Sequence, residues 1–412
     1  WIIQGFHDPD IALLDRSVPT PTHTDIPYCC QLLASLMCKA FVADVKGAFT
    51  QGLRGQRPGR LFATPPPGGI PGETGNVLIE IRAEIYGLVS GPTGWRRSVL
   101  TTFDSLGFHR HPLAPCVVLK FEKKDLVGLV CIETDDFLGG GRGPAWEQAL
   151  EKLQKAYTFG KFKWLQKEAT EYSGRTLQQL GDYSITISMH RYLQPAHEIH
   201  LERGRGKDQK ALATEAELSK MRGLNGKLQW ATRNGMPQGV GDASMLAQRT
   251  SLGVLTVGDI SEANAALRRL KVTGSTPLKI WPIPFDRIRL VTFCDASLSN
   301  AGGGRTQLGW IVCAADKDVL DGKEARLSLL MFKSEANSRA TASTMLSEAN
   351  AMSFALADAE WLASWLGMAT NLDYDLRKRD VLNRKIQIRS ITKELHLIRV
   401  VYQCFHTTAN CC

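Results

Sequence analysis

The pattern of hydrophobic and polar residues along the chain predicts a mixture of strands and helices. Apolar runs predict strands at residues 41–44, 77–81, 117–121, 126–132, 184–189, 288–294, 309–314 and 326–332. Apolar residues at helical spacing predict helices at 31–37, 91–106, 145–157, 215–230, 262–270 and 343–366. Residues 54–76 are rich in proline and glycine and are expected to be a loop. We therefore expect an α+β fold.

Two adjacent carboxylates interrupt one of these apolar patterns. The run 126–132 leads into Asp135 and Asp136, and the chain then returns through Phe137 and Leu138 to three glycines. This pattern predicts two strands with the acids at the tip of the hairpin. Neighbouring like charges disfavour each other's ionisation. Taken alone, the pair fits either a solvated turn or a site that holds a cation.

Composition narrows the class of protein. A chain of 412 residues has room for two or three domains. The net charge of +9 favours a polyanionic partner without establishing one. Its 10 cysteines form no CxxC pair, which argues against a zinc site and suits a reducing, intracellular compartment. No apolar run has membrane-spanning length, no signal peptide is recognisable, and the start at Trp1 suggests a fragment of a longer protein.

A third carboxylate, Asp44, lies at the end of an earlier predicted strand. One carboxylate from a strand and two from a neighbouring turn are the donors that a two-metal phosphoryl-transfer site needs. Mg²⁺ prefers such carboxylate oxygens. We therefore expect Asp44, Asp135 and Asp136 to form a candidate magnesium site.

Four motifs follow one another in the N-terminal part of the chain. They are the segment 42–52 (VADVKGAFTQG), the segment 85–95 (IYGLVSGPTGW), Ser105-Leu106-Gly107-Phe108 with Ala114-Pro115-Cys116, and the hairpin that carries Asp135 and Asp136. In order and spacing they resemble the reverse transcriptases of Ty1/copia-type LTR retrotransposons. That family's motifs are D-V-K-x-A-F, L-Y-G-L-x-x-x-P-x-x-W, S-L-G-F with D-P-C, and Y-V-D-D.

The resemblance implies an RNA-directed DNA polymerase that uses two Mg²⁺ ions, an RNA template, a DNA primer, RNA/DNA hybrid and dNTPs. The catalytic metal ligands would be Asp44, Asp135 and Asp136, with Asp136 the most peripheral. Phe49 would screen the sugar 2′ position of the incoming nucleotide, and a core position on the helix after the strand is the alternative. The implied substrate-binding residues also include Tyr86, Gly87 and Pro92 beside the template and incoming base, and Gly174 and Arg175 at the primer end.

The C-terminal third resembles the ribonuclease H domain of the same polyproteins. Segment 291–297 (VTFCDAS) matches the first strand with its metal-binding Asp295, and segment 343–350 (STMLSEAN) matches the helix with its catalytic Glu348. The resemblance implies that Asp295 and Glu348 share Mg²⁺ and cleave RNA paired to DNA. Alone, Glu348 fits a surface helix position better, and the presence of Asp295 favours the catalytic interpretation.

Several departures from the family pattern leave a second interpretation open. Glu133 and Thr134 replace an aromatic-Val pair before the two acids, and a Lys-Ala-Arg expected before Trp1 is absent. Asp373 and Asp375 follow no apolar run, so we expect the third ribonuclease H carboxylate to be missing and that activity to be lost. The chain is therefore either a polymerase or a catalytically inactive remnant that keeps the fold and some nucleic-acid binding.

The expected architecture is a polymerase of the α+β class with an antiparallel palm sheet. Fingers and palm would occupy residues 1–180 and a helical thumb or connection 181–275. An incomplete ribonuclease H-like α/β domain would occupy residues 276–412.

Overall fold

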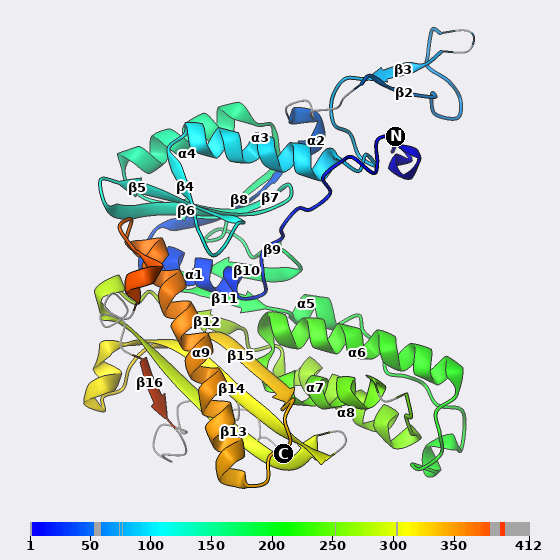
Figure 1. Ribbon diagram of the computed structural model, residues 1–412, viewed down its shortest axis with the longest axis vertical. Helices are drawn as coiled ribbons and strands as arrows, with labels where there is room; N and C mark the ends of the chain where they lie inside the picture. Colours follow the sequence, from blue (N-terminus) through cyan, green and yellow to red (C-terminus); the bar gives the residue numbers. More distant parts are fainter. Residues whose placement is uncertain are drawn as a thin grey trace. The chain divides into compact units, whose positions relative to one another are not determined.

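The computed structural model describes residues 2–52, 59–73, 75, 77–251, 253–301, 304–379 and 388–391. The chain divides into two compact units. The first contains Trp1–Thr22 and Ala40–Trp164, and the second contains His23–Lys39 and Leu165–Cys412. Figure 1 shows the elements of each.

A six-stranded sheet forms the centre of the first unit, in the order β4-β5-β6-β7-β1-β8. Strands β5, β6 and β7 form an antiparallel meander, and β1 pairs antiparallel with β8. The strands are β1 (Lys39–Val45), β4 (Phe108–Arg110), β5 (Val117–Glu122), β6 (Asp125–Glu133), β7 (Asp136–Gly141) and β8 (Phe159–Trp164).

Two helices, α3 (Gly91–Ser105) and α4 (Pro144–Ala156), cover one face of this sheet (Figure 1). Alternate residues of β1, among them Phe41 and Ala43, point into the core beneath these helices. This alternation follows from the two-residue repeat of a strand. The core therefore lies between the sheet and the helix pair.

Trp146 of α4 lies directly against the backbone of the sheet. Gly128 of β6 and Gly141 of β7 are register partners, and both face this indole. A Cβ atom at either position would lie 2.2 Å from a Trp146 ring carbon. Only glycine permits this close approach, so the glycines set the distance between α4 and the sheet.

The remaining elements of the first unit are the short helices η1 (Gly5–His7) and α2 (Ala48–Gln51) and a small sheet formed by β2 (Leu61–Ala63) and β3 (Ile79–Ile81). The N-terminal segment is bound to the chain ahead of α3, since the Ile3 N–H donates to the Tyr86 carbonyl at 3.0 Å.

The second unit contains a four-stranded sheet, β12-β11-β10-β9, and a group of helices. The helices are α1 (Asp25–Ser35), α5 (His190–Leu193), η2 (Arg205–Lys207), α6 (Glu215–Gly235), η3 (Pro237–Gly239), α7 (Val240–Ser251) and α8 (Val257–Thr273). The strands are β9 (Thr170–Tyr172), β10 (Arg175–Gln179), β11 (Ile185–Ser188) and β12 (Leu278–Ile280). Thr214 and Thr256 begin α6 and α8 with complete capping boxes, which explains where these helices start.

A second sheet of this unit has the order β15-β14-β13-β16. Strands β13, β14 and β15 are antiparallel neighbours, whereas β16 runs parallel to β13. The elements are η4 (Phe285–Arg287), β13 (Ile288–Ala301), β14 (Arg305–Asp316), η6 (Lys317–Asp321), β15 (Leu327–Ala336), α9 (Thr344–Thr370), η7 (Leu376–Lys378) and β16 (Ile388–Ile391). This part of the unit therefore combines three antiparallel strands, a long helix and a parallel strand, and its assignment as a ribonuclease H-like domain stays a prediction.

The α+β class with an antiparallel sheet is confirmed. The sequence pattern did not predict the strand β16, because its four residues carry too weak a pattern to be recognised. The sequence pattern also failed to predict α7 and the strands β8, β9 and β10. No helix in the described ranges is both long and apolar enough to cross a membrane. The C-terminal segment from residue 392 lies outside the described residues.

Candidate active site

Of the three carboxylates of the predicted polymerase site, Asp44 and Asp136 lie on the neighbouring strands β1 and β7, and Asp135 lies in the turn before β7. Asp44 lies near the end of β1, and Glu133 pairs with Asp136 across β6 and β7. Thr134 and Asp135 therefore form the turn of the hairpin. The Val45 N–H donates to the Asp135 carbonyl at 2.9 Å, which binds this turn to β1. The hairpin tip predicted from the sequence is present, and it lies beside Asp44.

The acids perturb one another. Burial raises the pKa of Asp136 to about 6, with further contributions from the charges of Asp135 and Asp44, while Lys161 opposes the shift. Burial also raises the pKa of Asp135, and the charge of Asp44 adds to that effect. Crowded, half-buried carboxylates disfavour their own ionised state. A bound cation would relieve this cost.

The donor chemistry of these residues fits Mg²⁺, which binds carboxylate oxygens. Within the described ranges, however, no three side chains of the His, Cys, Asp and Glu types are grouped so as to hold one metal ion. Asp44, Asp135 and Asp136 therefore match Mg²⁺ in charge and atom type, and they do not converge on one point.

Trp95 of α3 supports the hairpin turn. Its indole Nε1 donates to the main-chain carbonyl of Thr134 at 2.6 Å, and the side chain is 1% exposed. The ring packs edge-on against Tyr157 at 5.2 Å between centroids. Thr134 itself has φ of +54°, a conformation that non-glycine residues rarely adopt. The hydrogen bond thus compensates for local backbone strain directly before Asp135.

Gly160 of β8 provides space for Asp44. A Cβ atom at Gly160 would lie 2.9 Å from Asp44 Oδ2, which is closer than such contacts normally come. The next residue, Lys161, is the register partner of Asp44 and lowers the pKa of Asp136. Sequence reasoning missed both residues, because β8 carries no pattern that predicts a strand. It also missed the role of Trp95, although this residue belongs to one of the four motifs.

Phe49 and Tyr86 form an aromatic pair beside the carboxylates. Their ring centroids are 4.7 Å apart at an interplanar angle of 47°. Phe49 is half-buried and Tyr86 is 40% exposed. Burial raises the pKa of the Tyr86 hydroxyl, as do the charges of Asp135 and Asp44. The structure therefore brings these two predicted substrate-binding residues together with the acids.

Gly87 and Pro92 shape the segment that carries Tyr86. Gly87 has φ of +96°, and a Cβ atom there would lie 1.9 Å from the Ile3 carbonyl oxygen. Only glycine fits this backbone crossing. Pro92 lies in the first turn of α3, where a missing N–H costs nothing. Both residues thus have a clear structural role close to Tyr86.

Glu133 is an unusual neighbour for this site. Its Oε2 is buried and accepts no hydrogen bond from any residue that the structure describes. Its charge also helps to raise the pKa of Asp136. A buried carboxylate oxygen without a donor is costly, so Glu133 adds unfavourable negative charge next to the metal-binding candidates.

Gly174 and Arg175 belong to the second unit. Gly174 has φ of +70° and lies against the indole of Trp230. Arg175 is 2% exposed and donates to the side chain of Asn234 and to the carbonyls of Ser173 and His23. In this unit Arg175 therefore joins the β9–β10 turn to α6 and to the segment that precedes α1.

Asp295 and Glu348 also belong to the second unit. Asp295 is exposed on β13 opposite Gly309, and Glu348 is half-buried in the first turns of α9. Ala351, one turn after Glu348, packs into the core formed with β13 and β14. Glu348 thus lies on the side of α9 that faces the sheet. Asp373 and Asp375 follow the end of α9 and are not on a strand.

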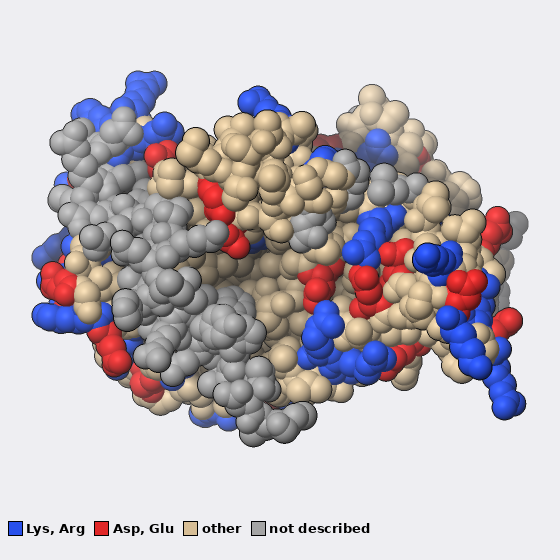
Figure 2. Space-filling model, turned by 90° about the horizontal axis from the view of Figure 1, so that it is seen from below, with Lys and Arg blue, Asp and Glu red and all other residues tan. Residues whose placement is uncertain are grey.

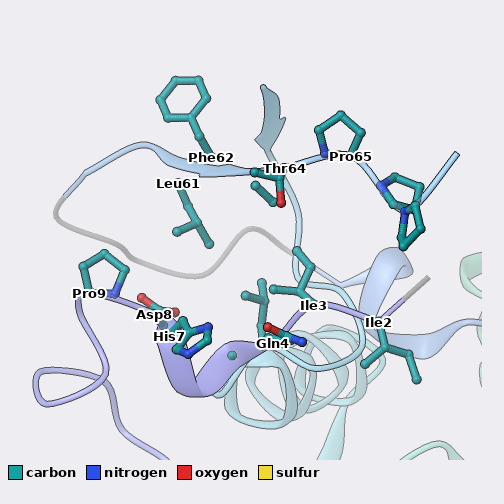
Figure 3. Close-up of a pocket in the computed structure, with 15 residues that line it drawn as sticks. Ile2, Ile3, Gln4, His7, Asp8, Pro9, Leu61, Phe62, Thr64 and Pro65 are labelled. Carbon is teal, nitrogen blue, oxygen red and sulfur yellow. The ribbon is translucent and has the colours of Figure 1, made fainter. Parts of the chain in front are cut away.

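A cavity of about 580 Å³ lies between the N-terminal segment and β2. Figure 3 shows Leu61 pointing into it, toward the side of Ile3 and Asp8, while Phe62 points away. Of the described residues, none that we predicted for the active site lines this cavity. On the face drawn in Figure 2, basic and acidic side chains are interspersed, so the positive net charge forms no continuous basic surface there.

No protein-family model matches the chain, and no curated protein matches its sequence. Among solved structures, the foamy viral protease-reverse transcriptase dRH in complex with double-stranded DNA is similar, with a TM-score of 0.51 and 11% identity. The alignment covers 92% of this chain and 60% of that chain. The same viral protein in complex with an RNA/DNA hybrid gives a TM-score of 0.47 at 11% identity, over 89% of this chain and 45% of that one. The first similarity shows a reverse transcriptase-like fold.

Proposed function

We propose that this chain is an RNA-directed DNA polymerase of a copia-type retrotransposon, which adds dNTPs to a primer 3′-OH. The observation that carries the proposal is the position of Asp44 beside Asp135 and Asp136 on adjacent strands of a reverse transcriptase-like fold. The raised pKa values of Asp135 and Asp136 are typical of acids that are held together for function.

Asp44 and Asp135 would hold Mg²⁺, with Asp136 more peripheral. Two such ions supply activation of the attacking hydroxyl and stabilisation of the leaving oxygen. Trp95 holds the Asp135 turn in position, and Gly160 leaves room for the Asp44 carboxylate. The ring of Phe49, packed on Tyr86, would exclude a 2′-hydroxyl from the site and so select dNTPs.

The proposed partners are an RNA template, a DNA primer and the RNA/DNA hybrid that they form. The foamy viral protein was solved with double-stranded DNA, and its fold resembles that of this chain. The net charge of +9 suits a polyanion, because basic side chains neutralise phosphates and release counterions. In the second unit, Asp295 and Glu348 are the two candidate Mg²⁺ ligands for cleavage of the hybrid. Without a third acid we do not propose that this cleavage occurs.

The second candidate is a catalytically inactive remnant that keeps the fold and binds nucleic acid. Glu133 favours it, because its buried oxygen lacks a donor among the described residues and its charge raises the pKa of Asp136. The intact set of Asp44, Asp135 and Asp136 favours the enzyme.

Primer extension on an RNA template with Mg²⁺ tests the proposal. We expect extension by the wild-type chain and none by Asp44→Asn or Asp135→Asn. Asp125→Asn is the matched control, since this acid lies exposed at the opposite end of β6. Extension that survives Asp135→Asn would refute the metal assignment. No extension by the wild type, with activity gained by Glu133→Tyr, would identify the remnant.

A further inference from the structure

A second cavity, of about 360 Å³, lies within the second unit between α6, α7 and β15. Its wall includes Arg233 from α6, Ser244 from α7, Lys333 and Ser334 from β15, and His23 from the segment before α1. None of these residues belongs to the predicted polymerase or ribonuclease H sites. The cavity thus carries a group of hydrogen-bond donors that the proposed activity does not use.

Two serine hydroxyls on this wall accept hydrogen bonds from glutamine amides, and Ser244 Oγ accepts one from Gln248 Nε2 at 3.3 Å. Gln307 Nε2 donates to Ser244 Oγ at 3.0 Å and to Ser334 Oγ at 2.7 Å. Gln248 Nε2 donates to Gln307 Oε1 at 2.8 Å, which fixes the orientation of the Gln307 amide. Both serine oxygens therefore act as acceptors, and neither hydroxyl donates to a described residue. Their protons remain available to a ligand that accepts hydrogen bonds.

Cationic groups surround the same space. The Arg233 guanidinium is exposed and makes no ion pair or hydrogen bond with a described residue. Lys333 is different, because Asp358 pairs with it at 2.9 Å. Glu335 also lines the cavity, on an exposed position of β15. Asp358 and Glu335 together balance the formal charges of Lys333 and Arg233, and Arg233 is the cation of the cavity wall that no described acid pairs with.

The imidazole of His23 lies close to three cationic side chains. Burial lowers the pKa of His23, and the charges of Lys333, Arg233 and Arg175 lower it further, while Asp358 opposes them. Burial disfavours an added charge of either sign, and only the part of the shift that comes from the three cations indicates a positive potential at His23. The imidazole stays neutral and can donate one hydrogen bond from a ring nitrogen.

We propose that this cavity binds a phosphate group. Two hydroxyl donors, a fork-shaped guanidinium and a neutral imidazole match the several acceptor oxygens and the charge of a phosphate. Its volume is at the lower end of small-ligand sites, so it admits a phosphate or a mononucleotide rather than a larger molecule. The same chemistry also fits a single phosphate of a nucleic-acid strand. The proposal does not depend on polymerase activity.

Calorimetric titration of the full chain tests it with three probes: inorganic phosphate, deoxyadenosine 5′-monophosphate and a short oligonucleotide without a terminal phosphate. We expect saturable binding that Arg233→Gln weakens about tenfold, which corresponds to about 1.4 kcal/mol, because a charge-assisted hydrogen bond is lost. Ser334→Ala should weaken it less. Arg222→Gln, an exposed arginine of the same helix that does not line the cavity, is the matched control and should bind like the wild type.

The probe that binds identifies the source of the phosphate group. Binding of inorganic phosphate or the mononucleotide indicates a small-molecule site, and binding of the oligonucleotide alone indicates a strand contact. The His23 proton signals, assigned by comparison with His23→Gln, should show a raised pKa when the site is saturated. If no probe binds, or if Arg233→Gln binds as tightly as the wild type, the proposal is wrong. Both outcomes can be read whether or not the chain extends a primer.

Discussion

The indole of Trp95 and the carbonyl of Thr134 form a hydrogen bond of 2.6 Å between α3 and the turn that carries Asp135. Trp95 is buried, and Thr134 has a positive φ. The bond therefore connects a helix in the core to the most strained residue of the candidate site. Its donor is a single N–H group, which a substitution can remove while most of the aromatic packing stays.

Trp95→Phe should reduce primer extension more than it reduces stability. Loss of one hydrogen bond is expected to lower the free energy of unfolding by about 1 kcal/mol, plus the cost of a smaller ring. Without this hydrogen bond the turn can shift and displace the Asp135 carboxylate, which should slow extension roughly ten- to a hundredfold. Urea denaturation and primer extension measure the two effects. Trp146→Phe is the control for loss of indole volume, and equal effects of the two variants on extension would contradict a positioning role of Trp95.

Gly160→Ala should displace the Asp44 carboxylate without unfolding the protein. The added Cβ would lie 2.9 Å from Asp44 Oδ2, so the side chain must move away. Because that atom ends a short side chain, stability should change by less than about 1 kcal/mol. Extension should fall by roughly tenfold or more. Gly181→Ala, where a Cβ would meet no atom within 4 Å, is the control. Full activity of Gly160→Ala would show that Asp44 does not need this space.

Asp136→Asn should be more stable than the wild type at pH 7 to 8, and this advantage should shrink at lower pH. The folded-state pKa of Asp136 is about 6, compared with 3.8 for the unperturbed group. Between these values the folded state binds more protons than the unfolded state, so wild-type stability rises as pH falls from about 7 to about 4. Asparagine removes the ionisation and with it the cost at neutral pH.

Urea denaturation of both proteins across this range measures the effect, with Asp125→Asn as the control. Added Mg²⁺ should also reduce the difference, because it would pair with the wild-type carboxylates. A difference that does not vary with pH would mean that Asp136 ionises normally.

Arg175→Ala should mainly destabilise the second unit. The guanidinium is buried and bonded to Asn234, whose amide oxygen would lose this donor. A loss of about 2–4 kcal/mol is expected from the unsatisfied group and the lost packing. Thermal unfolding measures it, with the exposed Arg191→Ala as control. If Arg175 instead contacts the primer, affinity for an RNA/DNA hybrid will fall while stability stays unchanged.

Much of the fold can be predicted from the sequence where the pattern is local. The hairpin that carries Asp135 follows from a long apolar run and its return, and α3 follows from Pro92 and a helical stripe of apolar residues. Strand β16 could not be predicted, because its four residues become a strand only by pairing with β13. The hydrogen bonds of this strand come from pairing with a segment that is distant in the sequence, and the propensities of its own residues do not predict that pairing.

The proximity of the candidate acids was predictable from the sequence, and the residues that contact them were not. Asp44 and Asp135 were recognisable from their motifs. Gly160 and Lys161 lie on β8, a strand that is defined only by its pairing with β1. The burial of Arg175 depends on Asn234, which is distant in the sequence. Such contacts form only in the tertiary structure, so no local sequence pattern predicts them.

Helix α1 has a consequence for the order in which the protein forms during synthesis. It precedes β1 in the chain, yet it belongs to the second unit, where Gln31 donates to the carbonyl of Trp281, 250 residues later, and Tyr28 packs on Trp365. Nearly all of its side chains are buried. On the ribosome, these apolar residues emerge long before their partners do. The apolar side chains of α1 therefore stay exposed to water while the first unit folds. This exposure makes the segment prone to aggregation and a target for chaperones during synthesis.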